Sequence, residues 1–257
     1  MSDKFFQAKA YLSYWLDAVD EHSLHSPFFF DFFTRVVKAN RHATPLEKAE
    51  TLRSKLLRDK RVLNGHDPGS GSSARRDVST IARNSMSPTT LSTLYNSAID
   101  YFKAEKVIEL GTSFGINTLY LASKKERSVT TFEGSPEIAD IAKLTFEFAG
   151  AKNIRLVEGN LDQTLKDYLQ SIRKFDLVLI DANHRYEPTL RYFSLILPKL
   201  QESTIVILDD IHYSAEMEKA WNELKRHKLV YGSADLFRCG FLFFDPSLNK
   251  QHVILQF

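Results

Sequence analysis

The spacing of apolar positions separates a helical beginning of the chain from a longer part in which two periodicities alternate. Between residues 5 and 62, apolar side chains recur at the spacing of amphipathic helices. From residue 106 onward, short β-branched or apolar runs alternate with helical patterns, which is typical of parallel strands joined by crossover helices. The last runs, residues 229–237, 240–244 and 252–257, are separated by short loops and are expected to be antiparallel strands. We therefore expect a doubly wound, mostly parallel α/β sheet.

The same pattern predicts three parts of the chain. Residues 1–63 form an N-terminal helical extension, and residues 77–257 form the main domain. Residues 64–76, rich in Gly, Ser and Pro, are a flexible linker or a lid between them. Phe28, Phe29, Phe30, Phe32 and Phe33 load one predicted helix with more aromatic surface than one helical face can hide. That surface is covered by the main domain or by a second copy in a homodimer, or it helps to wall an apolar substrate pocket.

One stretch, residues 106–122, reads as a strand, a glycine turn and a helix. Its apolar run ends at Glu109-Leu-Gly111, and Thr112 and Ser113 precede a second glycine, Gly115. Glycines allow positive φ and close approach of a ligand, while a helix start offers unpaired N–H groups. The G-x-x-x-G spacing lacks the third glycine of the dinucleotide fingerprint and the Gly-Lys-Ser/Thr of a P-loop. A nucleotide-like cofactor is therefore expected, although a βα turn without a ligand is the alternative.

Polar residues also follow the next two predicted strands, where open α/β sheets bind ligands. Glu133 lies 22 residues after Gly111, about where an acid accepts hydrogen bonds from ribose hydroxyls. The third strand ends in Glu158-Gly159-Asn160-Leu161, a polar group that could edge an adenine. The ordered series of strand-end acids strengthens the nucleotide interpretation.

Carboxylates follow the fourth and fifth strands. Asp181 and His184 stand after the fourth, and Asp209 and Asp210 after the fifth. If these strands are neighbours, the three carboxylates can converge on one point, where they repel unless a cation or protons intervene. Oxygen ligands suit Mg²⁺; the alternative is that the acids contact the cofactor or cap helices without a metal. His184 could take a proton from an attacking hydroxyl, or it could only orient its loop.

Composition narrows the function classes. The chain has 257 residues, 43% hydrophobic and 26% charged, with a net charge of +2, which argues against nucleic acid or an anionic membrane as partner. Basic clusters at residues 53–61, 75–76 and 124–127 are expected to be solvated faces. No apolar stretch reaches 18 residues, and the single cysteine, Cys239, fits a reducing cytoplasm. A cytoplasmic protein acting on a small molecule is expected.

The motifs resemble those of class I S-adenosylmethionine-dependent methyltransferases over residues 104–245. E-L-G-T-S-x-G at Glu109 is similar to their motif I, and D-x-x-H-x-Y at Asp181 with D-D at Asp209 resembles the metal-dependent O-methyltransferases of catechols, caffeoyl thioesters and sugars. The resemblance implies a seven-stranded Rossmann-like sheet with antiparallel C-terminal strands. It also implies that Glu133 binds ribose, Asn117 lies near the methionine end and Asn160-Leu161 border the adenine.

For the second half of the site, the resemblance makes Asp181, Asp209 and Asp210 metal ligands, with Asp181 also near the cofactor. In the catechol branch a lysine stands at the place of His184, and Asp-Asn stands at the place of Asp209-Asp210. The identity of the acceptor molecule therefore stays open. We expect S-adenosylmethionine as cofactor, Mg²⁺ as a second candidate and a hydroxyl as acceptor. An N-methyltransferase, a cofactor-binding module without catalysis and an NAD-dependent oxidoreductase are the alternatives; the oxidoreductase lacks its third glycine.

Overall fold

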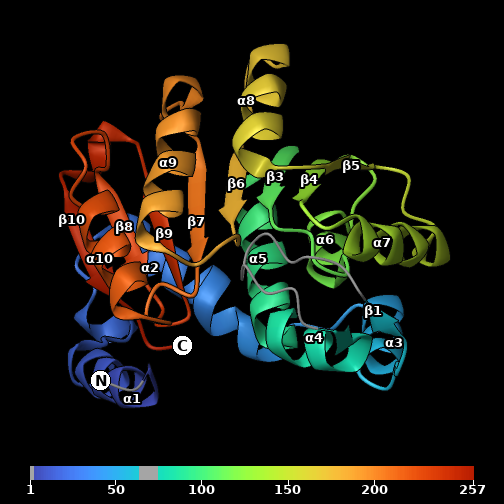
Figure 1. Ribbon diagram of the computed structural model, residues 1–257. Helices are drawn as coiled ribbons and strands as arrows, with labels where there is room; N and C mark the ends of the chain where they lie inside the picture. Colours follow the sequence, from blue (N-terminus) through green and yellow to red (C-terminus); the bar gives the residue numbers. More distant parts are fainter. Residues whose placement is uncertain (1–2, 64–74) are drawn as a thin grey trace. The chain divides into compact units, whose positions relative to one another are not determined.

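The computed structural model describes residues 3–63 and 75–257 (Figure 1). The predicted linker or lid at 64–76 falls mainly outside these residues. The chain divides into two compact units, one of Met1–Ala39 with Arg173–Phe257 (unit 1) and one of Asn40–Ile172 (unit 2). These units follow a different division from the predicted parts, whose boundaries stay a prediction.

Unit 2 contains three parallel strands in the order β3-β4-β5. Glu109 lies opposite Thr131, and Glu133 opposite Glu158, so the strands end at one edge. The strands are β3 (Lys106–Leu110), β4 (Ser128–Glu133) and β5 (Ile154–Glu158), with a short antiparallel pair, β1 (Val62–Leu63) and β2 (Arg76–Asp77). The helices are α3 (Glu47–Leu56), α4 (Val78–Ser85), α5 (Thr89–Phe102), α6 (Ile116–Leu121), α7 (Pro136–Ala149) and α8 (Leu161–Ser171).

Unit 1 contains five strands in the order β6-β7-β9-β8-β10. They are β6 (Leu177–Ile180), β7 (Ile205–Asp209), β8 (Gly232–Asp235), β9 (Cys239–Phe243) and β10 (Gln251–Ile254). Only β9 runs against its neighbours, because β10 pairs parallel with β8. Both edges of β9 are already occupied by β7 and β8, so the returning chain can add only to the outer edge of β8. The helices are α1 (Asp3–Asp17), α2 (Pro27–Phe32), α9 (Tyr186–Ile196) and α10 (Ala215–Leu224).

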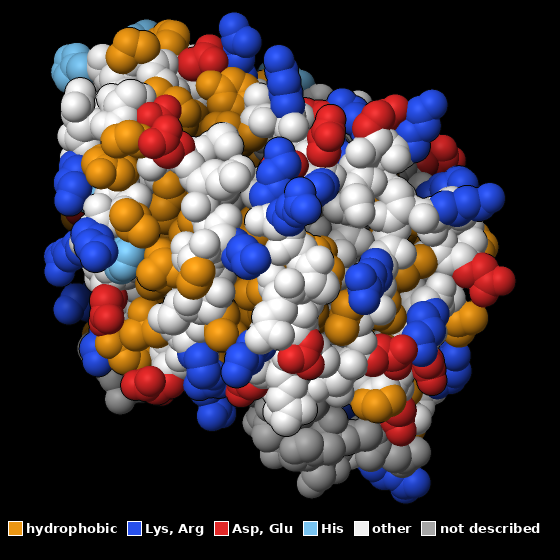
Figure 2. Space-filling view, turned by 90° about the horizontal axis from the view of Figure 1, so that it is seen from above, with side chains coloured by type: hydrophobic (Ala, Val, Ile, Leu, Met, Phe, Trp, Pro, Cys, Tyr) orange, Lys and Arg blue, Asp and Glu red, His pale blue; other side chains and the backbone are white. Residues whose placement is uncertain are grey.

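The predicted α/β class with a mostly parallel sheet is confirmed. The sheet has eight strands rather than seven, and β9 is its antiparallel member. In the part of the chain that the structure describes, no helix combines the length and the apolarity needed to cross a membrane. On the face seen in Figure 2, basic and acidic side chains lie interspersed.

The Phe-rich segment packs within unit 1. Phe29, Phe32 and Phe33 are buried, and the rings of Phe28 and Phe32 meet Phe243 edge-on at 4.9 and 5.5 Å. Their surface is therefore covered by β9, as the intramolecular packing interpretation predicts. Phe30 stays exposed on α2, and α1 carries a larger group of exposed apolar side chains, at Phe5, Tyr11, Leu12, Trp15 and Leu16.

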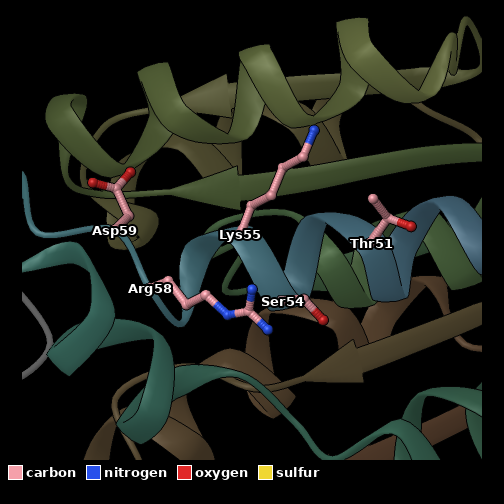
Figure 3. A pocket seen from close by; sticks show the side chains of 5 residues that line it. All are labelled: Thr51, Ser54, Lys55, Arg58 and Asp59. Atoms are coloured by element: carbon pink, nitrogen blue, oxygen red, sulfur yellow. The ribbon is translucent and has the colours of Figure 1, made fainter.

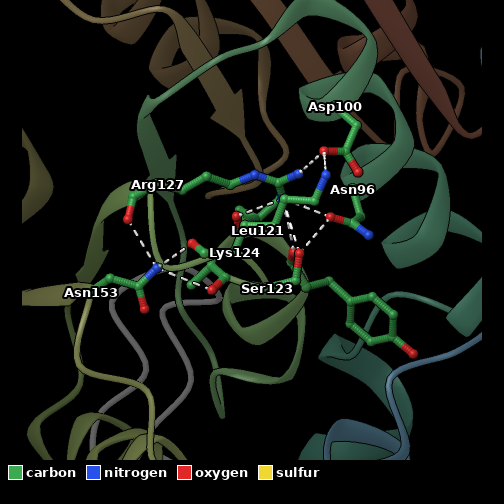
Figure 4. A network of polar contacts seen from close by, with 9 residues as sticks. Asn96, Asp100, Leu121, Ser123, Lys124, Arg127 and Asn153 are labelled. Carbon is green, nitrogen blue, oxygen red and sulfur yellow. Dashed lines mark hydrogen bonds and ion pairs between the residues drawn. The ribbon is translucent and has the colours of Figure 1, made fainter.

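Arg127, expected on a solvated face, is the centre of a buried polar network in unit 2 (Figure 4). Its side chain is 4% exposed, and its guanidinium donates to Asn96 Oδ1 at 2.6 Å, to the Leu121 carbonyl at 3.1 Å and to Asp100 Oδ1 at 2.7 Å. Asn153 Nδ2 donates to three carbonyls of the same segment, those of Ala122, Lys124 and Arg127. The network satisfies backbone groups left unpaired where α6 ends and the chain turns into β4.

A second buried ionisable group in unit 2 is Glu109 on β3. Its side chain is fully buried and accepts hydrogen bonds from Thr118, Thr131 (2.7 Å) and Asn117 (3.2 Å). Burial raises the pKa of Glu109 from 4.5 to about 7, because removing water disfavours the charged form more than the three donors favour it. This carboxyl thus holds a proton at pH values where an ordinary glutamate has lost it.

We predict that Arg127→Met lowers the free energy of unfolding by roughly 3 kcal/mol, because it leaves buried acceptors without their donor. Lys124→Ala is the matched control, since Lys124 pairs with the same Asp100 but is 56% exposed, and such pairs contribute less than about 1 kcal/mol. Urea unfolding of both variants measures the difference. Equal losses would show that the buried network does not stabilise the unit.

We also predict that the free energy of unfolding falls as pH rises from 4.5 to about 7, because native Glu109 keeps a proton that the unfolded chain releases. The loss amounts to roughly 3 kcal/mol, at about 1.4 kcal/mol for each pKa unit. Glu109→Gln should remove this part of the slope, since a glutamine keeps an acceptor for the two threonines. Exposed Glu126→Gln is the control; a slope retained in Glu109→Gln would contradict the assignment.

Candidate active site

In unit 2, the predicted site residues begin at the turn between β3 and α6. Gly111 and Gly115 have φ values of 106° and 80°, which only glycine adopts without strain. A Cβ on Gly115 would stand 2.5 Å from the ring of Phe146 on α7, so this position has no room for any other residue. The backbone N–H groups of Gly111 and Thr112 donate to the Phe132 carbonyl at 3.2 and 3.0 Å. The glycines thus let the turn fold tightly against the end of β4.

Glu133 fixes this turn from the end of β4. Its two carboxylate oxygens accept the backbone N–H groups of Ser113 and Ser135, each at 2.9 Å. A carboxylate has about four acceptor positions, so one such group can accept several donors at once. The carbonyl of Glu133 also accepts the N–H of Gly159 at 2.9 Å, where φ is 123°. The ends of β3, β4 and β5 are therefore joined by hydrogen bonds around one residue.

Asn117 and Asn160 are predicted site residues of unit 2 that lie at the starts of two helices. Asn117 Nδ2 donates to Glu109, whereas its buried Oδ1 has no hydrogen-bond partner in the described structure. An unpaired buried acceptor is costly, so a donor such as an ammonium group fits there. Asn160 caps α8 by accepting the N–H of Asp162 at 3.0 Å, and Leu161 is the first residue of that helix.

These features fit the amino-acid and ribose ends of S-adenosylmethionine. Asn117 Oδ1 would accept from the ammonium group, and Glu133 from the ribose hydroxyls. Ser85, which the sequence reasoning missed, lies beside the turn, with its hydroxyl 2.8 Å from that of Ser113. A lone serine after a predicted helix carries no signal that could have found it.

In unit 1, the predicted site residues begin at the end of β6. Asn183 and His184 have positive φ values of 64° and 40°, and the His184 N–H donates to the Ala182 carbonyl at 2.8 Å. This tight loop turns His184 back toward Asp181, with 3.4 Å between Nε2 and Oδ1. The two side chains are 31% and 15% exposed, so the pair is accessible to a ligand. The predicted catalytic residues Asp181 and His184 are thus brought together.

The end of β7 does not form the expected metal cluster. Asp209 is 3% exposed and its Oδ1 accepts the N–H of Asp210 at 3.0 Å. Asp210 has a φ of 52° and its carboxylate is held by Arg238, with 3.0 Å from Nε and 2.9 Å from Nη2 to Oδ1. Among the described residues no three His, Cys, Asp or Glu side chains are arranged to hold a metal ion. The convergence of Asp181, Asp209 and Asp210 is therefore not found, because a guanidinium engages Asp210.

A hollow of about 610 Å³ lies elsewhere in unit 2 (Figure 3). Its lining residues, Thr51, Ser54, Lys55, Arg58 and Asp59, all come from α3 and the segment after it. Lys55 lies over the ring of Phe148, and Asp59 pairs with Arg61. None of the predicted site residues lines this hollow, so we assign it no part in the site.

Comparisons with known proteins identify the kind of domain. Residues 108–211 match the model of a family described as "Methyltransferase domain". That range begins in β3 and ends just after Asp210, so it includes the motif residues of both units. No curated protein matches the sequence.

Solved methyltransferases share the fold. The structure is similar to PaMTH1 of Podospora anserina bound to S-adenosylhomocysteine (TM-score 0.60, 16% identity, 86% of this chain and 99% of that one). It is also similar to a Bacillus cereus O-methyltransferase in complex with S-adenosylhomocysteine (0.59, 16%, 80% and 94%). A third is TomG of Streptomyces achromogenes, an O-methyltransferase involved in tomaymycin synthesis, solved with S-adenosylmethionine (0.57, 14%, 82% and 95%). Residues 108–211 thus match a methyltransferase-domain model, and the structure has the fold of these solved methyltransferases.

Proposed function

We propose that the protein transfers a methyl group from S-adenosylmethionine to a hydroxyl oxygen of a small molecule. The observation that carries the cofactor assignment is the pair of acceptors in unit 2, Glu133 at the strand ends and the unpaired Asn117 Oδ1. The matched methyltransferase domain supports the transfer, and O-methyltransferases among the similar structures support oxygen as the acceptor atom.

We assign cofactor contacts to the predicted site residues of unit 2 and to Asp181. Gly111, Thr112, Ser113 and Gly115 supply the turn, while Gly159, Asn160 and Leu161 border the adenine. Glu109 acts through Asn117, whose amide it holds at 3.2 Å. When bound, the cofactor supplies a sulfonium methyl group, which is already a good electrophile. The protein then has to position the acceptor oxygen and remove its proton, and positioning contributes on the order of 7–11 kcal/mol at best.

His184 is the proposed base. With a proton on Nε2 facing Asp181, the neutral imidazole presents Nδ1 as an acceptor for the hydroxyl proton. The imidazolium formed by that transfer is stabilised by the Asp181 carboxylate, as in other base–carboxylate pairs. The motifs predict magnesium assistance through Asp181, Asp209 and Asp210. In the structure, Arg238 pairs with Asp210 instead.

N-methylation is the second candidate, since a histidine base and a methyl donor would also serve an amine. A homodimer through the N-terminal helices stays a prediction, and the exposed apolar side chains of α1 are the surface that it would use.

We predict that the protein binds S-adenosylhomocysteine and that Glu133→Gln weakens this binding roughly 10- to 100-fold, the cost of losing a hydrogen bond to a charged group. Asp140→Asn is the control, because Asp140 is a 71% exposed carboxylate of the same unit. Calorimetric titration measures both affinities. Absence of binding to the wild type would refute the proposed function, and equal affinities in the two variants would refute the role of Glu133.

We predict that His184→Gln lowers methyl transfer by about 10²- to 10⁴-fold while leaving the affinity for S-adenosylhomocysteine unchanged. The assay incubates the protein with S-adenosylmethionine and a panel of catechols, sugars and matched amines, and mass spectrometry reports the methylated atom. His22→Gln, whose side chain is 84% exposed, is the control. Methylated amines without methylated hydroxyls would favour the second candidate, and full activity of His184→Gln would remove the proposed base.

A further inference from the structure

The acids at the ends of β6 and β7 require a positive charge nearby. The two strands are parallel, with Ile180 opposite Leu208, so the next residues along them, Asp181 and Asp209, are neighbours across the ladder. Asp210 follows directly in sequence. Carboxylates at neighbouring strand ends raise one another's cost of ionisation unless a cation or protons compensate them. The question is therefore which cation does so.

The β-ladder places Arg238 beside Asp210. In the antiparallel pairing of β7 with β9, Asp209 lies opposite Cys239. Because the strands run in opposite directions, the residue before Cys239 stands opposite the residue after Asp209. Arg238 therefore meets Asp210 through backbone register, and its Nε and Nη2 both point at Oδ1, at 3.0 and 2.9 Å. The register brings the two backbones together, and the Arg238 side chain, which is 46% exposed, completes the contact.

The turn that carries Arg238 is itself held firmly. Asp235 Oδ2 lies 2.9 Å from His212 Nε2 and accepts the Trp221 indole N–H at 3.0 Å, while its Oδ1 accepts the Phe237 N–H at 2.9 Å. The Phe237 ring stacks on His212 with centroids 5.5 Å apart and planes 16° from parallel. His212 belongs to the loop after Asp210. The β8–β9 turn and the acid-bearing loop are thus joined by three contacts: His212 with Asp235, His212 with Phe237, and Asp210 with Arg238.

A guanidinium in this position competes with a metal ion for the same oxygen. It stays charged at every physiological pH and presents several N–H donors in a fixed plane. A hard divalent cation would share the Asp210 carboxylate with the charged guanidinium of Arg238, which repels it, and would also need oxygens of Asp181 and Asp209. The described residues provide no other group of three acidic, His or Cys side chains arranged for a metal. The residues as they are placed therefore fit a guanidinium better than they fit a metal ion.

We propose that Arg238 is the resident counter-ion of the Asp209–Asp210 pair and takes the place of a divalent cation. The metal dependence that the motifs imply is then absent, and removal of the acceptor proton falls to His184. The statement about removal of the acceptor proton rests on the proposed function. The test by metal binding does not depend on that function.

The experiment is a calorimetric titration with Mn²⁺ of five purified proteins: wild type, Arg238→Gln, Asp210→Asn, the double variant of these two, and Arg226→Gln. Arg226→Gln removes the same charge from an exposed position of unit 1 and controls for the general loss of positive charge. We expect Arg238→Gln to bind Mn²⁺ at least about tenfold more tightly than wild type, because each 1.4 kcal/mol of lost competition is a factor of ten. Arg226→Gln should match wild type, and the double variant Arg238→Gln with Asp210→Asn should lose the gained site.

Two results would overturn the inference. One is an equal Mn²⁺ affinity of wild type and Arg238→Gln, and the other is a tight wild-type site that Asp210→Asn abolishes. Titration of the same samples with S-adenosylhomocysteine separates this failure from failure of the proposed function: a protein that binds no S-adenosylhomocysteine refutes the methyltransferase, while the Mn²⁺ ratio still decides the role of Arg238. Melting curves of all variants show that each is folded.

Discussion

The turn between β3 and α6 depends on the carboxylate of Glu133 and on the backbone donors whose hydrogen bonds it accepts. One side chain at the end of β4 accepts the N–H groups of Ser113 and Ser135, and its own carbonyl accepts the N–H of Gly159. Three segments that are distant in sequence thereby end at one place. The glycines of the turn are what make this arrangement possible, since a side chain at Gly115 would collide with Phe146. The binding geometry and the packing of α7 are thus parts of the same constraint.

The acids of the two units are compensated in three different ways, and each way suits its position. Glu109 is fully buried and holds a proton, because its pKa is raised to about 7. Glu133 accepts backbone N–H groups, which favour the charged form at the surface of the turn. Asp210, just beyond the end of β7, meets the guanidinium of Arg238. The chemistry at each strand end follows from what the surrounding backbone can supply.

The similar solved structures share this fold at 14–16% identity, so the architecture survives almost complete replacement of the side chains. What the fold requires is a glycine turn after β3 and a polar residue at each following strand end. These requirements leave the acceptor side free to differ. In unit 1 of this chain, the loops after β6 and β7 combine a His184–Asp181 pair with an arginine on the β8–β9 turn.

The sequence alone determined the features that depend on neighbours along the chain. The alternation of apolar runs and helices gave the α/β class, and the glycine spacing located the turn at Gly111–Gly115. Glu133 was found because it directly follows an apolar run, and His184 because it stands three residues after Asp181, which does. The pairing of Arg238 with Asp210, the burial of Arg127 and the parallel pairing of β10 with β8 were decided only by tertiary structure. Each of them depends on strand register or on packing between distant segments, and a local pattern of polar and apolar residues carries no information on either.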